Sequence, residues 1–243
     1  MKLALYLTFP YPDRETFSTF FGEMMRMRFD YLELGIPTGT PYYDGPIIRR
    51  THRKAMEGFS FSFLKEIVNV SRLAGKKNYA LVYYNHFHSS TGKFLDDLKE
   101  AGIDGAIVPD LLTDYYDERR QLSEEMKKRD LSLIPFFTSS TPDSAIREMT
   151  LLTDSWIYHG LQPSTGIRVP VSIDLMVSRI RKLCNDREII FGFGINSMEM
   201  VRELRAEGAD GIAVGSSLVS YMDSNDRQGF RSEIEMLGDA VYD

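Results

Sequence analysis

The stretch EIIFGFGINSMEMVRELRAEGADGIAVG, residues 188–215, contains one complete strand–helix–strand unit. Its two ends, 188–194 and 210–215, are short apolar runs of the kind found in strands that are buried on both faces. The middle, 196–209, has apolar residues at helical spacing, and Gly208 stands where a helix commonly ends. This order predicts two parallel strands joined by a crossover helix.

The same alternation continues along the whole chain. Eight strand-like runs occur, at 3–8, 31–36, 79–84, 104–109, 131–137, 155–160, 188–194 and 210–215. Segments with helical periodicity lie between them, among them 13–28, 91–102, 113–130, 141–152 and 196–209. Eight such units in 243 residues predict an α/β protein with a single (β/α)8 (TIM) barrel. No Pro-, Gly- or Ser-rich linker divides the chain, so residues 1–243 are expected to form one domain.

Composition excludes several classes of protein. The net charge of −6 argues against a nucleic-acid-binding surface over the whole chain. The single cysteine, Cys184, allows no intrachain disulfide, and the four scattered histidines show no zinc-ligand spacing, so no metal is expected. No apolar run approaches the length of about 18 residues that a membrane span needs, which favours a cytoplasmic protein. The basic cluster IIRRTHRK, 47–54, is either a solvated helix face or a surface that attracts an anion.

Glu33 interrupts the most strand-like segment of the chain, YLELGI at 31–36. If Leu32 and Leu34 face the surrounding helices, alternation points Glu33 into the barrel, where lysines on helices cannot easily reach it. A carboxyl held in an apolar mouth has a raised pKa, which suits proton transfer near neutral pH. Glu33 is therefore interpreted as a catalytic acid/base, with a structural ion pair as the alternative.

The next carboxylate, Asp44, lies in an unusually long connection. The starts of the second and third predicted strands, Tyr31 and Tyr79, are 48 residues apart, and a Gly/Pro/Thr-rich loop fills the surplus. Long loops inside compact domains are usually functional, and active groups of such barrels lie at the C-terminal ends of strands. Asp44 is thus a candidate site residue, although an Asp before Gly-Pro is also a common turn former.

Glycines end the last two predicted strands. Gly194 and Gly215, followed by Ser216, are placed to offer free backbone N–H groups to a phosphate, as this region does in many barrels. The loop after the sixth strand, 161–170, adds Thr165 and Gly166 and is long enough to act as a lid. Plain turn chemistry is the alternative for each glycine.

Taken together, the motifs resemble the α subunit of tryptophan synthase over nearly the whole chain, and archaeal-type members most closely. The resemblance rests on LELGIP with its following DGP, on YYN, VPDLL and STG after the third, fourth and sixth strands, and on GFGI and GSSLV after the seventh and eighth. It implies a lyase that cleaves indole-3-glycerol phosphate to indole and glyceraldehyde 3-phosphate without a cofactor. It also implies a β-subunit partner that converts the indole to tryptophan.

The resemblance also implies roles for individual residues. Glu33 matches the proton shuttle at indole C3, and Asp44 matches the aspartate that binds the indole N–H, which displaces the turn interpretation. The phosphate-binding positions of the family match Gly166, Gly194, Gly215 and Ser216. Phe193 is expected to line the indole pocket, and supporting roles are expected for Asp110, near the active face, and Asn85, near the subunit contact.

Three features depart from the family pattern. Leu3 already opens the first strand, without the helix that precedes it in bacterial members, so the barrel floor is expected to be closed differently or left open. Thr40 stands where an aspartate commonly helps signal to the β subunit, and the sixth loop lacks an arginine. Because of the last two changes, we expect communication with the β subunit to differ from that of typical family members, and the basic chemistry to stay the same.

Two other functions fit parts of the pattern. One is a different phosphate-binding barrel, such as a phosphoribosyl isomerase or a prenyl transferase. Isomerases of that kind usually have an acidic residue at the end of the first strand, where this chain has Thr8. A barrel that has lost activity and serves as a binding partner would not need to keep both Glu33 and Asp44. His86 and His88 look like a metal pair but lack accompanying carboxylates, so they are interpreted as polar loop residues.

Overall fold

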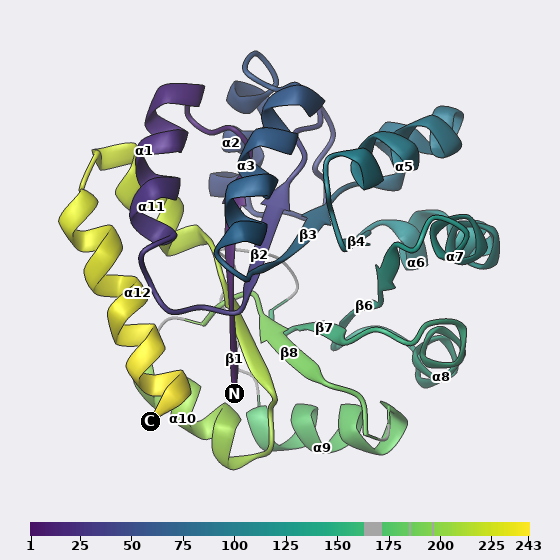
Figure 1. Ribbon diagram of the computed structural model, residues 1–243. Coiled ribbons are helices and arrows are strands. Elements are labelled where there is room, and N and C mark those ends of the chain that lie inside the picture. Colours follow the sequence, from purple (N-terminus) through teal and green to yellow (C-terminus); the bar gives the residue numbers. More distant parts are fainter. Residues whose placement is uncertain (163–171, 185, 196) are drawn as a thin grey trace.

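A computed structural model describes residues 1–162, 172–184, 186–195 and 197–243. Parallel strands form the centre of the molecule, and helices surround them, as Figure 1 shows. The strands in the described residues are β1 (Lys2–Thr8), β2 (Tyr31–Gly35), β3 (Lys77–Leu81), β4 (Gly105–Ile107), β5 (Ser132–Ile134), β6 (Phe136–Thr138), β7 (Ile157–Gly160), β8 (Ile189–Gly192) and β9 (Gly211–Val214). The predicted (β/α)8 barrel is confirmed.

The predicted strand at 131–137 is two strands rather than one. The sheet runs in the order β5-β4-β3-β2-β1-β9-β8-β7-β6, so its two ends are β5 and β6. Only Pro135 separates them in the chain, and its carbonyl accepts a hydrogen bond from the Tyr158 N–H at 2.9 Å. Proline has no N–H to donate, which interrupts the ladder at this residue. One strand position of the barrel therefore pairs with β4 through its first half and with β7 through its second.

Helices follow the strands along the chain. Those in the described residues are α1 (Arg14–Met24), α2 (Pro46–Ala55), α3 (Phe61–Leu73), α4 (Tyr84–Phe87), α5 (Thr91–Glu100), α6 (Leu111–Asp114), α7 (Arg119–Lys127), α8 (Asp143–Leu152), α9 (Ile173–Cys184), α10 (Met198–Ala206), α11 (Ser216–Ser224) and α12 (Arg227–Tyr242), with 3-10 turns at His88–Ser90 and Tyr116–Glu118. None of these helices is both long and apolar enough to cross a membrane.

The ends of the helices follow local sequence signals. Ser197 caps α10 by accepting a hydrogen bond from the Met200 N–H at 3.2 Å, and Gly208, with a φ of 91°, follows its last turn. The helix predicted over 113–130 is wrong in its first part, where α6 and a 3-10 turn precede α7. Tyr115, with a φ of −132° and a ψ of 38°, leaves the helical region there.

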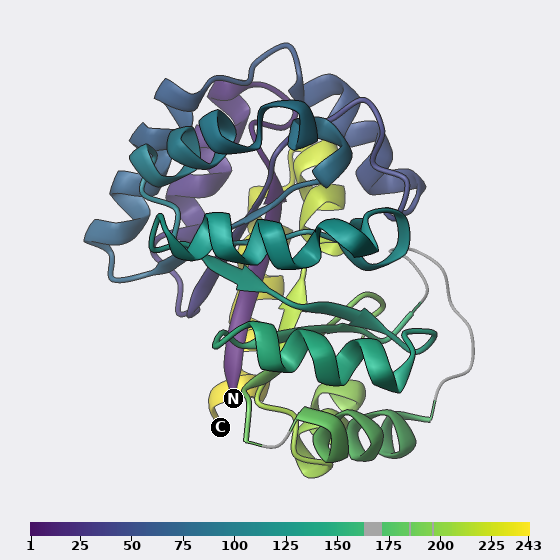
Figure 2. The same ribbon diagram turned by 90° about the vertical axis from the view of Figure 1, so that its right-hand side faces the viewer.

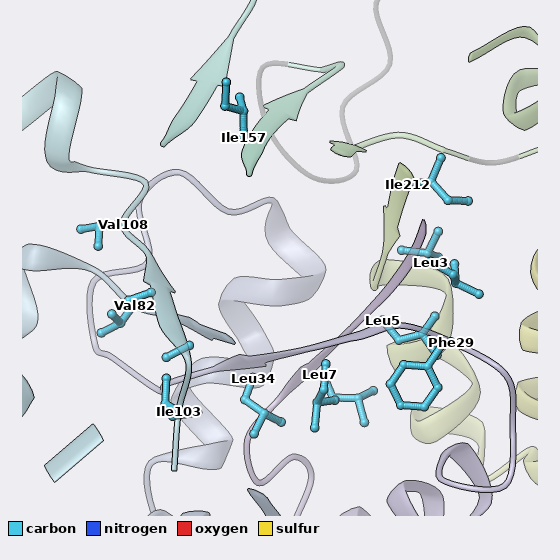
Figure 3. Packing of buried hydrophobic residues seen from close by; sticks show 14 of the residues in the cluster. Leu3, Leu5, Leu7, Phe29, Leu34, Val82, Ile103, Val108, Ile157 and Ile212 are labelled. Atoms are coloured by element: carbon cyan, nitrogen blue, oxygen red, sulfur yellow. The ribbon is translucent and has the colours of Figure 1, made fainter. Parts of the chain in front are cut away.

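Side chains alternate between two apolar layers. Leu3, Leu5 and Leu7 of β1 pack outward against the helices, and Figure 3 shows them in the same cluster as Leu34 of β2. The intervening Ala4 and Tyr6 belong to a second cluster, which fills the barrel itself. This alternation fixes which β2 side chains point into the barrel.

Aromatic side chains fill the barrel on the N-terminal side of Glu33. The Tyr31 ring, two residues before Glu33 on the same face of β2, lies 5.6 Å from that of Trp156 and 5.3 Å from that of Tyr79. The Tyr31 hydroxyl donates to Glu188 at 2.8 Å, which joins β2 to the start of β8. The barrel floor is therefore filled by side chains from the strands and from the residues that directly precede them.

The two ends of the chain lie together. Figures 1 and 2 both show the termini at the same end of the barrel, and the Met1 amino group lies 3.4 Å from the carbonyl of Val241. The last helix, α12, packs against α1, α10 and α11. The first and last β–α units thereby lie side by side in the ring of helices around the strands.

Candidate active site

A cavity of about 450 Å³ opens at the C-terminal ends of the strands. Its walls include Tyr6 of β1, Glu33 of β2, Asp44 of the β2–α2 loop, Tyr158 of β7, Phe193 after β8 and Gly215 after β9. Mostly apolar pockets with a few converging polar groups at this face are the usual active sites of (β/α)8 barrels. The structure thus brings together both predicted carboxylates, the predicted indole-pocket residue Phe193, and three predicted phosphate-binding residues, Gly194, Gly215 and Ser216.

Glu33 points into the barrel, as alternation predicts, because Leu32 and Leu34 belong to the outer layer. Its side chain is fully buried, and neither carboxyl oxygen has a hydrogen-bond partner among the described residues. No described cation forms an ion pair with it, which removes the structural alternative for this residue. Burial raises the pKa of Glu33 from 4.5 to about 8, so the carboxyl is mostly protonated at neutral pH.

Asp44 is also buried but is hydrogen-bonded. The Tyr83 hydroxyl donates to Asp44 Oδ2 at 2.8 Å, and Arg49 Nε donates to the Asp44 backbone carbonyl at 2.5 Å. Burial raises the pKa of the Asp44 carboxyl to about 6, while the Tyr83 hydrogen bond and the Arg49 charge oppose that rise. Asp44 is therefore mostly ionised at neutral pH.

His52 is a site residue that sequence reasoning missed. The basic cluster 47–54 forms most of α2, and its arginines and lysine are exposed as the solvated-face interpretation predicts. His52, however, is fully buried, and its Nε2 lies 3.8 Å from Asp44 Oδ2. Its spacing from Ile48 and Thr51 would have identified it, because positions i, i+3 and i+4 share one helix face.

The backbone around the predicted phosphate site is built for close approach. Gly194 has a φ of 99°, which a side chain tolerates poorly, and it lines the cavity beside Ile195. Gly215 precedes α11, and a Cβ there would lie 2.7 Å from the Tyr6 ring. Ser216, the first residue of α11, also lines the cavity, so a helix N-terminus faces this space. Thr165 and Gly166 lie outside the described residues.

Asp110 and Asn85 are not among the residues that line the cavity. The Asp110 carboxylate accepts hydrogen bonds from the N–H groups of Tyr84, at 2.7 Å, and Asn85, at 3.0 Å. The Asn85 side chain in turn donates to Thr40 Oγ1 at 3.0 Å, and Tyr115 donates to it at 2.9 Å. These hydrogen bonds join the segment that follows β3 to the long loop that carries Asp44. Among the described residues, no three His, Cys, Asp or Glu side chains gather as a metal site would require.

The fold and the cavity define a (β/α)8-barrel protein with two buried acids at the C-terminal ends of its strands. A family model described as the tryptophan synthase alpha chain matches residues 1–239. The chain belongs to the tryptophan synthase alpha chain family, whose members are lyase-type enzymes.

Individual relatives agree with this assignment. The tryptophan synthase alpha chain of Sulfurisphaera tokodaii is 32% identical over 235 residues, which cover 97% of this chain and 94% of that protein. The solved tryptophan synthase A-subunit of Pyrococcus furiosus has a TM-score of 0.85 and 26% identity, with 98% of each chain covered. A chain of Mycobacterium tuberculosis tryptophan synthase has a TM-score of 0.85 and 26% identity, over 99% of this chain and 92% of that one. The predicted resemblance, including that to archaeal members, is confirmed.

Proposed function

We propose that the chain cleaves indole-3-glycerol phosphate to indole and glyceraldehyde 3-phosphate in a retro-aldol reaction, and that the indole passes to a tryptophan synthase β subunit. The observation that carries the proposal is the pair of acids in one cavity, Glu33 with a pKa of about 8 and Asp44 with a pKa of about 6. Family membership supplies the substrate, and the two protonation states fit the chemistry that this substrate needs.

The reaction needs a proton at C3 of the indole ring and a negative charge near N1. In the proposed mechanism, protonated Glu33 donates to C3, which gives an indolium cation. Ionised Asp44 accepts the N1–H hydrogen bond and stabilises the positive charge that develops there. The side-chain hydroxyl next to the ring then loses its proton to Glu33, and the C–C bond breaks as its electrons return to the ring. The proton gained by C3 balances the proton lost from the hydroxyl.

This scheme invokes no cofactor, because the protonated ring itself accepts the electrons. Phosphate is proposed to bind at the start of α11, where the backbone N–H groups of Gly215 and Ser216 and the helix dipole favour an anion. Gly194, Thr165 and Gly166 are proposed to complete that site. Phe193, in the cavity wall, is proposed to contact the indole ring.

A β subunit is proposed to dock over the cavity mouth. Tyr42 of the long loop is 60% exposed, and Ile47 at the start of α2 is 37% exposed and lines the cavity. Exposed apolar side chains beside an active site are typical of a surface that a partner covers. The similarity to a chain of the M. tuberculosis enzyme supports the same proposal.

Indole release from indole-3-glycerol phosphate, measured with and without a tryptophan synthase β subunit, tests the proposal. We expect indole and glyceraldehyde 3-phosphate in equal amounts. A matched control is the Glu33→Gln variant, which keeps the shape of the side chain but removes the transferable proton. Absence of indole under both conditions would contradict the proposed activity, and so would wild-type release by the control.

A further inference from the structure

A chain of buried polar groups lies beneath Asp44 and meets at His52. The His52 Nδ1 atom accepts a hydrogen bond from the backbone N–H of Thr38 at 3.2 Å. Its Nε2 atom lies 3.3 Å from the hydroxyl of Tyr6 and 3.8 Å from Asp44 Oδ2. One imidazole therefore contacts the long loop, strand β1 and the carboxylate at the same time.

The direction of each hydrogen bond in this chain can be deduced from its far end. Thr51 donates its hydroxyl proton to the carbonyl of Ile48 at 2.7 Å, so the 2.6 Å bond between Thr8 and Thr51 must use the proton of Thr8. The 3.0 Å bond between Tyr6 and Thr8 must then use the proton of Tyr6. The Tyr6 oxygen is left as an acceptor, and His52 Nε2–H is the donor that faces it.

Both ends of the imidazole thus require the same neutral tautomer. Thr38 needs an unprotonated Nδ1, and Tyr6 needs a protonated Nε2. A second proton on Nδ1 would face the Thr38 N–H, donor against donor. Burial lowers the pKa of His52 to about 4, in agreement with this geometry.

Asp44 is the acidic group among the side chains that surround His52. Tyr6 approaches from β1, Tyr83 stacks edge-on from the connection after β3, and Asp44 approaches from the loop. His86 on α4 is the nearby basic group, and its charge also disfavours a second proton on His52. The imidazole therefore presents an N–H dipole, rather than a positive charge, to the Asp44 carboxylate.

We propose that His52 is a positioning residue for the reaction proposed above: its Nε2–H side orients and stabilises ionised Asp44 in the cavity, while its Nδ1 side anchors the loop that carries Asp44. This inference rests on the proposed function. A cation at this place would neutralise the carboxylate and weaken its attraction for the indolium. The dipole of the neutral Nε2–H group, 3.8 Å from Asp44 Oδ2, stabilises the carboxylate and leaves its charge available to the substrate.

Two amide variants separate the two sides of the ring. His52→Gln can place an N–H donor near the position of Nε2, which keeps the side that faces Tyr6 and Asp44. His52→Asn can place its carbonyl oxygen near the position of Nδ1, which keeps the Thr38 contact and removes the donor. His88→Asn, at an exposed position, is the matched control.

Steady-state indole release and its pH profile are the first readouts. We expect His52→Asn to lower kcat by about 10-fold or more with little change in KM, while His52→Gln stays within about threefold of the wild type. The acidic limb of the profile should move to higher pH in His52→Asn but not in His52→Gln, because the carboxylate loses the nearby N–H dipole that stabilises it. If His52 had only a structural role, the acidic limb would not move, and kcat would not fall in His52→Asn alone.

A second readout does not depend on activity. The pKa of the Asp44 carboxyl can be followed by carbon NMR of aspartate-labelled protein, with the resonance assigned from its loss in Asp44→Asn. We expect a higher Asp44 pKa in His52→Asn than in the wild type, and a wild-type value in His52→Gln. Equal behaviour of the two amide variants in both measurements would overturn the inference. A wild-type protein that releases no indole would instead overturn the proposed function.

Discussion

Glu33 and Asp44 line one cavity, yet only the Asp44 carboxylate is hydrogen-bonded: Tyr83 donates to it, whereas Glu33 has no partner among the described residues. Burial raises the pKa of both acids, and in Asp44 the Tyr83 hydrogen bond and the Arg49 charge offset part of that rise. The pKa of Glu33 rises to about 8, and that of Asp44 to about 6. At neutral pH one acid holds a proton and the other holds a charge, as the proposed division of labour requires.

Loss of either the Glu33 proton or the Asp44 charge should abolish most of the activity. We expect Glu33→Gln and Asp44→Asn each to reduce kcat for indole formation by about 10²-fold or more, because one loses the proton and the other the charge. Steady-state kinetics give the change, and circular dichroism checks that the fold is intact. Wild-type turnover by a folded variant would remove that residue from the mechanism.

The pH dependence of kcat/KM should be bell-shaped. Activity needs ionised Asp44 and protonated Glu33, so it should rise through a pH of about 6 and fall through a pH of about 8. In Tyr83→Phe, the loss of the hydrogen bond to the charged form of Asp44 should raise its pKa and move the acidic limb upward. The alkaline limb, which reports Glu33, should stay in place. An unchanged acidic limb would exclude Asp44 as its source.

The Glu33→Gln substitution should lower activity but raise stability at alkaline pH. The folded-state pKa of about 8 exceeds the ordinary value of 4.5, so the folded protein binds this proton more tightly than the unfolded chain does. The free energy of unfolding should therefore decrease as pH rises from 4.5 to 8, relative to Glu33→Gln. At pH 8 the variant should be more stable by on the order of a few kcal/mol, since one pKa unit corresponds to about 1.4 kcal/mol.

Denaturant unfolding of both proteins at pH 4 and pH 8 measures this difference. The two curves should nearly coincide at pH 4, where the glutamate is protonated in both states. A variant that is less stable than the wild type at pH 8 would contradict the unpartnered burial of Glu33.

Gly215 should determine phosphate affinity. A Cβ at this position would lie 2.7 Å from the Tyr6 ring, and the residue precedes the first turn of α11. We expect Gly215→Ala to displace the backbone N–H groups there and to raise the KM for indole-3-glycerol phosphate by about 10-fold or more, while indole itself binds as before. Calorimetric binding of inorganic phosphate and of indole to the two proteins tests this separation. Equal loss of both ligands would indicate a collapsed cavity instead.

The isolated chain is expected to have low activity that a β subunit increases. The carboxylate Asp44 lies on a long loop, and partner binding should favour the arrangement in which the loop covers substrate. Thr40 accepts a hydrogen bond from Asn85 within this region. We therefore expect Thr40→Asp to change the activation by the β subunit more than the activity of the isolated chain. Indole release with and without the β subunit measures both quantities. Equal rates with and without the partner would refute this coupling.

Much of this architecture could be predicted because apolar periodicity dictates it. The Leu32 and Leu34 pattern alone turns Glu33 inward, and the β–α repeat alone gives the barrel. The break at Pro135 was missed because two short strands in one apolar run read as a single strand. Strand propensity cannot show that the residues before Pro135 pair with β4 while those after it pair with β7.

Pattern reading failed at His52 for a different reason. Four basic residues surround it on α2, so local charge suggested a solvated face, whereas its partners Tyr6 and Thr38 come from distant parts of the chain. Contacts of that kind are fixed by tertiary packing. The role of Asp44 likewise followed from family resemblance, since its local sequence also suits a turn.

The aromatic floor formed by Tyr31, Tyr79 and Trp156 has a consequence for how Glu33 is recharged. These rings occupy the barrel behind the carboxyl, so we expect solvent protons to arrive through the mouth, which the proposed substrate would fill. In the proposed mechanism, the proton that Glu33 donates to the ring is replaced by the one that the substrate hydroxyl releases. In the proposed mechanism one proton therefore leaves Glu33 with the indole product and another arrives from the substrate, so a turnover takes up no net proton from bulk water.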